Sequence, residues 1–157
     1  MILDCNEIIP DRLWVGGHVR PQDVGHLKFI GITTVVNIQS DEDIKSCGVP
    51  LKKIIKAYDA AGLELRRAPT PDFDKAALIA NLPQCVAEVE AALKPPWARV
   101  YLHCTAGINR SPTTAAAFLI RTRGLSAKEA FDYVNARRHC SPYLNILERY
   151  AESLKLP

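Results

Sequence analysis

The sequence predicts an α/β protein with a central, mostly parallel twisted sheet flanked by helices. Short runs rich in β-branched and apolar residues alternate with longer segments whose apolar residues recur at helical spacing, as a parallel sheet with covering helices requires. The chain has 157 residues, of which 48% are hydrophobic. This length suits one core but not two, so we expect a single domain over residues 1–157.

In the first half of the chain, strands and helices alternate. Three short segments are dominated by apolar or β-branched residues, which predicts strands: residues 12–15, 33–38 and 63–67. The helices between them are residues 21–30, where Pro21 fits a first helical turn, and residues 49–61. In the second of these helices, Ile54, Ile55 and Tyr58 supply an apolar face at helical spacing.

In the second half, the predicted order is a helix, a strand and then three helices. Residues 75–93 carry apolar residues at helical spacing and end before a pair of prolines, and residues 99–103 form a buried strand. Local start and stop signals delimit the remaining three helices. The first begins at Arg110 and ends at Gly124. The second begins with a capping box of Ser126 and Glu129 and runs to about residue 138, and the third begins at Ser141 and Pro142.

The strand at residues 99–103 leads into a turn that begins at Cys104 and ends at Arg110, the most informative segment of the chain. The residues between them are small or tolerate turns, and Gly107 can adopt backbone angles closed to other residues. Successive N–H groups can therefore face one concavity and bind an anion. The helix that begins at Arg110, with Pro112 in its first turn, directs a partial positive charge at the same point. The residues expected to hold the substrate are Thr105, Ala106, Gly107, Ile108 and Asn109.

Three side chains of this segment suit phosphoryl transfer. Helix N-termini and cationic neighbours favour an ionised cysteine, so we expect Cys104 to be a thiolate and the nucleophile. Arg110 presents a planar set of donors that grips two phosphoryl oxygens. Ser111 offers a hydroxyl that can donate to the sulfur when it leaves. The pattern therefore predicts hydrolysis through a phosphocysteine intermediate, with Cys104, Arg110 and Ser111 as catalytic residues.

Two other interpretations of Cys104 carry less weight. Free cysteines are usually buried core residues, but that role would make the spacing to Gly107 and Arg110 a coincidence. A metal site formed by His103 and Cys104 is disfavoured because no second Cys or His lies at ligand spacing. We therefore expect neither a metal nor another cofactor, and we expect His103 to hold the turn by hydrogen bonds.

A phosphocysteine enzyme needs a general acid for the leaving oxygen, and we expect it on a separate loop. The stretch after residues 63–67 is a proline-stiffened loop that contains Asp72 and Asp74. Asp74 stands directly before the helix at residues 75–93 and fits the role of N-cap. Asp72 is therefore the candidate acid.

These motifs resemble the cysteine-based dual-specificity phosphatase family of the protein tyrosine phosphatase superfamily. The signature is Cys-x5-Arg, with His103 before it and Ser111 after it. Within the family the likeness is to laforin-like and plant starch glucan phosphatases, and the segments that carry it are residues 15–17, 21–24, 31–41, 72–74, 104–107 and 138–142. The resemblance implies a dual-specificity phosphatase-like sandwich, Asp72 as general acid and Phe73 as an aromatic contact for sugar rings.

The substrate is less sharply determined than the chemistry. Asn109 stands where glucan phosphatases usually have a glycine, and Ser141 stands where some plant members have an aromatic residue, with Tyr143 as the nearest substitute. Phosphoglucan and phosphoprotein therefore rank together as substrates. Inositol polyphosphates or phosphoinositides rank lower, because the loop beside Arg110 adds no further cations. A catalytically silent phospho-binding module is the remaining alternative, which the complete catalytic set disfavours.

Composition limits the partners and the compartment. The net charge of +3 is mild and the Lys and Arg residues are spread along the chain, so we expect a phosphorylated substrate as partner, without nucleic acid or a membrane. The amino-terminal segment has no apolar signal core, and we expect no stretch that is long enough to span a bilayer. The five cysteines are odd in number and irregularly spaced, which favours a reducing, cytoplasmic location. We expect a monomer.

For Arg137, Arg138 and Cys140 the sequence indicates secondary roles. Arg137 and Arg138 at a helix end are interpreted as partners of the helix dipole, with a second phosphate contact as the alternative. Cys140 lies in a segment that the resemblance places near the site. A disulfide between Cys140 and oxidised Cys104 is a minor hypothesis for redox control.

Overall fold

The computed structural model describes residues 2–157. Within them, five strands form one sheet in the order β1-β2-β5-β3-β4. The strands are β1 Cys5–Ile9, β2 Leu13–Gly16, β3 Thr34–Gln39, β4 Glu64–Thr70 and β5 Val100–His103. Of these, β1 alone pairs antiparallel with its neighbour, and the other pairs are parallel. The predicted α/β class with a mostly parallel sheet is confirmed.

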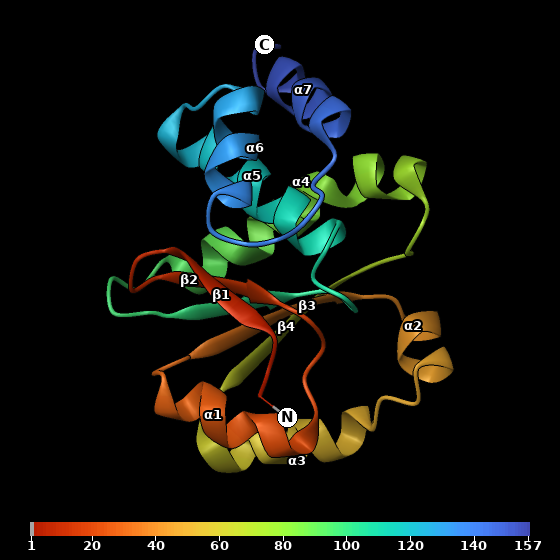
Figure 1. Ribbon diagram of the computed structural model, residues 1–157, viewed down its shortest axis with the longest axis vertical. Coiled ribbons are helices and arrows are strands. Elements are labelled where there is room, and N and C mark those ends of the chain that lie inside the picture. Colours follow the sequence, from red (N-terminus) through yellow and green to blue (C-terminus); the bar gives the residue numbers. More distant parts are fainter. Residues whose placement is uncertain (1) are drawn as a thin grey trace.

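Helices cover both faces of the sheet, as Figure 1 shows. The helices are α1 Val24–Phe29, α2 Asp41–Ser46, α3 Leu51–Ala61, α4 Lys75–Leu93, α5 Arg110–Arg123, α6 Ala127–Asn135 and α7 Leu144–Ser153, with a 3-10 turn at Pro21–Asp23 before α1. Helices α4 to α7 lie over one face, and α1 and α3 lie over the other (Figure 1). The short helix α2 contacts β3, whose carboxyl end it follows.

Local sequence signals account for several helix boundaries. Ser126 accepts a hydrogen bond from the Glu129 amide, and the Glu129 carboxylate accepts one from the Ser126 amide, so the expected capping box is present. Gly124 ends α5 with a left-handed φ of 66°. Helix α6 ends at Asn135, earlier than the expected residue 138, and is followed by a turn in which the amides of Arg137 and Arg138 both donate to Val134 O.

Two elements have no counterpart in the sequence-based prediction. Strand β1 is an edge strand with polar residues and a bulge, so it lacks the alternation of a half-buried strand. Helix α2 spans six residues, too few for a helical pattern. A capping box between Ser40 and Asp43 nevertheless begins α2, and it is the local signal that marks this helix.

Strand β4 extends three residues beyond the predicted end at residue 67 and passes through Pro69 to Thr70. Strand β4 is an edge strand, and Pro69 lies in an irregular stretch of its pairing with β3, where a residue without an N–H is tolerated. The extension carries the Thr70 carbonyl to the same edge of the sheet as the end of β5.

The central strand β5 fixes the position of the turn that follows it. Val100, Tyr101 and Leu102 are 0% exposed, since apolar residues of both helical layers pack against the sheet. Strands β2, β3 and β5 run parallel, so their carboxyl ends meet at one edge. Cys104 comes directly after β5 at that edge, which is where open α/β sheets bind ligands.

Among the helices of residues 2–157, α4 is the one that is long and apolar enough to cross a membrane, judged by length and composition only. The expectation that no segment meets this criterion is therefore wrong. Residues of α4 are nevertheless buried against β4, β5 and α5 in the larger core. Packing in this core accounts for the apolar composition of the helix.

Candidate active site

The turn at residues 104–110 joins β5 to α5, and the carbonyls of residues 104–109 are all held by hydrogen bonds from outside the turn or from α5. The donors are His103 Nδ1 to Cys104 O, His18 N to Thr105 O, Arg138 to Ala106 O and Gly107 O, Ser141 N to Ile108 O, and Thr113 N to Asn109 O. These donor–acceptor distances lie between 2.8 and 3.4 Å. The backbone of the turn is therefore anchored at every carbonyl.

With its carbonyls turned away, the turn presents its amides to the inside. In the part of the chain that the structure describes, the N–H groups of residues 105–109 make no backbone hydrogen bond. Gly107 has a φ of 69°, and a Cβ there would lie 2.5 Å from the backbone of Gly16. Helix α5 begins without a side-chain cap at Asn109, so its first amides are also free to bind a ligand. The backbone thus has the form of an anion-binding nest.

Arg138 braces this nest from behind. Its Nε donates to Gly107 O at 2.8 Å and its Nη2 to Ala106 O at 3.4 Å, while the other bonds of the guanidinium go to Asp4 and Asn6. The Arg138 side chain is 2% exposed, and its hydrogen bonds lower the pKa of Asp4. The interpretation of Arg138 as a dipole partner or a second phosphate contact is therefore wrong, because the side chain is buried beyond the end of α6.

Cys104 lies at the start of the nest, and its sulfur faces the first turn of α5. Its Sγ is 3.2 Å from Ser111 Oγ, and both residues are buried, Cys104 at 2% exposure. The Ser111 hydroxyl is thus placed where the sequence predicts, within reach of the sulfur.

Arg110 ends the nest and is held between two carboxylates. Its Nη1 donates to Asp43 Oδ2 at 2.5 Å and to Thr70 O at 2.7 Å, and its Nη2 lies 3.0 Å from Asp72 Oδ2. Its Nε is buried without a hydrogen-bond partner. One end of the guanidinium is therefore fixed by Asp43 and Thr70. The Nε–Nη2 edge, which can grip two phosphoryl oxygens, is occupied on one side by Asp72.

Asp43 on α2 is a site residue that the sequence analysis does not identify. Burial raises its pKa, but hydrogen bonds from Arg110 and Ser40 outweigh burial and lower the pKa below its ordinary value. Asp43 is therefore ionised at neutral pH and compensates the buried charge of Arg110. One sequence signal could have found it: Asp43 closely follows β3, and the carboxyl ends of parallel strands share an edge.

The loop between β4 and α4 gives its three central residues different positions. Asp74 accepts a hydrogen bond from the Ala77 amide at 2.9 Å, which confirms its predicted role as N-cap. Phe73 has a left-handed φ of 55°, strained for a residue with a side chain, and is 89% exposed. Asp72 faces Arg110 instead. The loop thus places a carboxyl group in the site and an aromatic ring in solvent beside it.

His103 supports the nest from within the sheet. Its Nδ1 donates to Cys104 O at 2.9 Å, and its ring stacks on Tyr101 with centroids 5.5 Å apart. Burial lowers the pKa of His103 to about 4, and the bond to Cys104 O offsets this only in part. His103 is therefore neutral at physiological pH and holds the carbonyl without adding a charge beside the sulfur.

The structure brings together the side chains predicted to be catalytic: Cys104, Arg110, Asp72 and Ser111. The amides of residues 105–109 form the nest, but the Asn109 side chain turns away and donates to Ser141 O at 2.8 Å. The Cys140 thiol contacts Asn135 and the Arg138 carbonyl, and no contact joins it to Cys104. The hypothesis of redox control by Cys140 therefore gains no support from the structure.

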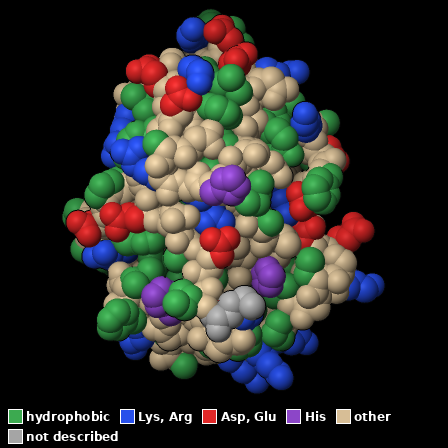
Figure 2. Space-filling model, viewed as in Figure 1, with side chains coloured by type: hydrophobic (Ala, Val, Ile, Leu, Met, Phe, Trp, Pro, Cys, Tyr) green, Lys and Arg blue, Asp and Glu red, His purple; other side chains and the backbone are tan. Residues whose placement is uncertain are grey.

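The positive potential of the site is local. Figure 2 shows acidic and basic side chains interspersed over the face in view. No group of three or more His, Cys, Asp or Glu among residues 2–157 is arranged to hold a metal ion. The amides of the nest, the start of α5 and Arg110 are therefore the groups that attract an anion here.

Comparison with known proteins matches this geometry to a family. The sequence profile of the dual specificity phosphatase catalytic domain matches residues 13–149, which include the nest, Asp72 and Arg138. The chain belongs to the dual specificity phosphatase family. The predicted resemblance to this family is confirmed.

Two relatives and one solved structure illustrate the likeness. Over 156 residues, the chain is 31% identical to phosphoglucan phosphatase DSP4, amyloplastic, of Castanea sativa, covering 97% of this chain and 41% of that protein. Over 148 residues, it is 32% identical to dual specificity protein phosphatase 12 of Mus musculus, covering 92% and 38%. The structure of human DUSP28 superposes with a TM-score of 0.72 at 26% identity, covering 99% and 98%. The chain thus spans about two fifths of the length of these two relatives.

We expect Arg138 to control activity through the backbone it braces. Replacing Arg138 by Met should lower kcat/KM for p-nitrophenyl phosphate by about a hundredfold, the effect of losing one oriented donor in an anion site. The affinity for vanadate should fall in parallel in protein that remains folded by circular dichroism. Replacing the neighbouring Arg137, which is exposed and donates to Tyr133 O, should change neither value. A folded Arg138→Met variant with full vanadate affinity would contradict the bracing role.

The buried His103 should make stability depend on pH. Its pKa is about 4 in the folded state and about 6.5 in an unfolded chain, so the unfolded state takes up the proton first as pH falls. The free energy of unfolding should be unaffected by His103 above pH 6.5 and should decrease between about pH 6.5 and 4 by on the order of 3 kcal/mol. Urea unfolding at several pH values measures this. The His103→Asn variant should show a flatter profile, and an unchanged profile would refute the assignment.

Proposed function

We propose that this protein hydrolyses phosphomonoesters through a phosphocysteine intermediate. The observation that carries the proposal is the convergence of a nest of unpaired amides, the Cys104 sulfur and the Arg110 guanidinium, with Asp72 3.0 Å from Arg110. Oriented amides and a guanidinium stabilise both a thiolate and the charge of a transferring phosphoryl group. No cofactor enters the proposed steps.

In the first step, the Cys104 sulfur attacks phosphorus, so that an S–P bond forms and the bond to the leaving oxygen breaks. The amides of residues 105–110 and the free edge of Arg110 hold the three other phosphoryl oxygens. Asp72 gives its proton to the leaving oxygen.

In the second step, water attacks phosphorus while Asp72, now a carboxylate, takes a proton from the water. The S–P bond breaks, inorganic phosphate leaves, and Asp72 is protonated again. Ser111, at 3.2 Å, donates a hydrogen bond to the sulfur as its negative charge returns. The cycle thus consumes one water and restores every side chain.

We infer that the substrate is a phosphoglucan or a phosphoprotein, with phosphoglucan preferred. The exposed ring of Phe73, next to Asp72, offers a flat apolar surface to a sugar ring that carries the phosphate. The name of the Castanea sativa relative supports the same substrate class. The name of the Mus musculus relative supports phosphoprotein as the second candidate.

Two further functions remain as alternatives. An inositol polyphosphate or phosphoinositide phosphatase would profit from extra cations in the nest. Arg110 is the one cation that the nest contributes, and the Asn109 amide group is bonded to Ser141 O. A silent phospho-binding module would need no general acid, whereas Asp72 faces Arg110 in this structure. Both alternatives therefore have less support.

The catalytic roles can be tested by three substitutions. Cys104→Ser should abolish turnover and retain vanadate binding, because the nest does not depend on the sulfur. Asp72→Ala should slow hydrolysis of a phosphoserine peptide by about a thousandfold but that of p-nitrophenyl phosphate far less, since p-nitrophenolate leaves without a proton. Asp74→Ala, the matched control, should cost about 1 kcal/mol of stability without changing the ratio of the two rates. An equal loss on both substrates would remove Asp72 from the acid role.

The substrate class can be tested by phosphate release from solubilised amylopectin, phosphopeptides and inositol hexakisphosphate at matched concentrations. We expect the highest kcat/KM on amylopectin. Phe73→Ala should lower that value several-fold and leave p-nitrophenyl phosphate unaffected, because a small substrate does not reach the ring. Trp97→Ala, which removes another exposed aromatic side chain, is the control. Faster hydrolysis of phosphopeptides would favour the protein phosphatase alternative instead.

A further inference from the structure

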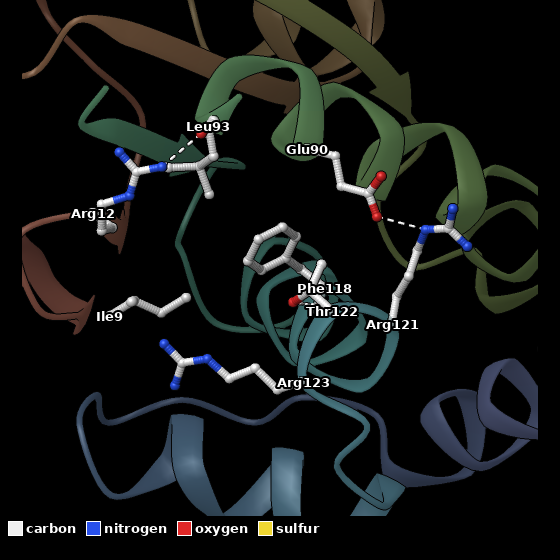
Figure 3. A pocket seen from close by; sticks show the side chains of 8 residues that line it. All are labelled: Ile9, Arg12, Glu90, Leu93, Phe118, Arg121, Thr122 and Arg123. Carbon is white, nitrogen blue, oxygen red and sulfur yellow. Dashed lines mark hydrogen bonds and ion pairs between the residues drawn. The ribbon is translucent and has the colours of Figure 1, made fainter. Parts of the chain in front are cut away.

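A second concavity lies away from the catalytic nest, beside the last two turns of α5 and the end of α4 (Figure 3). Its volume is about 670 Å³, within the usual size of small-molecule sites. The lining combines apolar side chains with arginines: Ile9, Leu93, Phe118, Arg12, Arg121 and Arg123. Figure 3 shows the Phe118 ring in the middle of this group, with the arginines around it. The cavity therefore has an apolar floor and a basic rim.

Two of the three arginines at this rim lack a carboxylate partner. Glu90 pairs with Arg121 at 2.5 Å. Arg12 donates to four carbonyls, those of Leu93, Pro95, Pro96 and Ala98, which hold the guanidinium without neutralising it. Arg123 lies over the Tyr133 ring at 5.8 Å, and within residues 2–157 no carboxylate pairs with Arg12 or Arg123. The cavity therefore carries a net positive charge that the fold leaves uncompensated.

Helix capping explains part of this arrangement but not its convergence. Arg121 and Arg123 stand in the last turn of α5, where cations complement the helix dipole. Arg12 comes from the turn before β2 and binds the carbonyl of Leu93 at the end of α4, a different helix, yet it lines the same cavity. Phe118 is 9% exposed and belongs to the larger core, and it also forms the floor of the cavity. Cations from two separate segments around an apolar floor are typical of a binding site for an organic anion.

We propose that this cavity binds a small amphipathic anion, an apolar ring or chain that ends in a carboxylate, sulfonate or phosphate. The apolar body would lie on Phe118, Leu93 and Ile9, and the charged end would bind Arg123 with Arg12 close by. The cavity is lined by the end of α5, whereas Arg110 is the first residue of α5. This anion site is therefore separate from the catalytic nest, and both can be filled together.

The fluorescent probe 8-anilinonaphthalene-1-sulfonate, an aromatic sulfonate, tests the site in the folded protein. We expect saturable binding of one probe per chain. Arg123→Ala should weaken it by about tenfold, the effect of one charge-assisted hydrogen bond. Arg137→Ala is the matched control, because Arg137 stacks on the same Tyr133 ring at 3.5 Å but does not line the cavity. Equal affinity in the wild type and Arg123→Ala, or an equal loss in Arg137→Ala, would overturn the proposal.

A displacement experiment tests the chemical class of the ligand. Octanoate should displace the probe, and inorganic phosphate at the same concentration should not, because it has no apolar body to cover Phe118. Displacement by both alike would show a site for bare anions and would contradict the proposal. Hydrolysis of p-nitrophenyl phosphate should be unchanged in Arg123→Ala, which also verifies that the variant is folded.

Discussion

The site depends on one constraint, the anchoring of six successive carbonyls between Cys104 and Asn109 away from the ligand. An unsupported loop would satisfy its amides with its own carbonyls in ordinary turns, and the nest would close. Here the carbonyls are bound by His18, Arg138 and Ser141, which come from distant parts of the chain, as well as by α5. The fold therefore keeps a row of amides unpaired and convergent before any substrate arrives, which is the preorganisation that electrostatic catalysis requires.

Arg110 shows how the same fold supports a buried charge and keeps it usable. A guanidinium at 3% exposure needs a compensating carboxylate, and Asp43 supplies it on the side where Thr70 O also binds. Asp72 contacts the opposite edge, the one that faces the nest. In the mechanism proposed above, the phosphoryl group would bind at this same edge, beside Asp72. The contact with Arg110 thus holds the Asp72 carboxyl group beside the place that we propose for the leaving oxygen.

The features that could be predicted from the sequence are those that depend on residues close together in the chain. The turn from Cys104 to Ser111 and the cap at Asp74 depend on neighbours within a few residues, so spacing and residue type were enough. Asp43 was missed, and Arg138 was given the wrong role, for the opposite reason. Asp43 binds Arg110 across 67 residues, and Arg138 binds Asp4 across 134, so their roles exist only once the sheet is assembled. Strand β1 was missed likewise, because an edge strand held by long-range pairing needs no regular pattern.

Helix α5 links the catalytic nest to the second anion cavity through its own electrostatics. Its first turn has no side-chain cap and carries a partial positive charge, and we propose that these features help the nest to hold phosphate. Its last turn has the opposite polarity and is stabilised by cations, here Arg121 and Arg123. One of these cations is neutralised by Glu90 and the other is not. The same helix dipole therefore favours an anion at the start of α5 and arginines at its end, and we propose that these arginines bind a second anion.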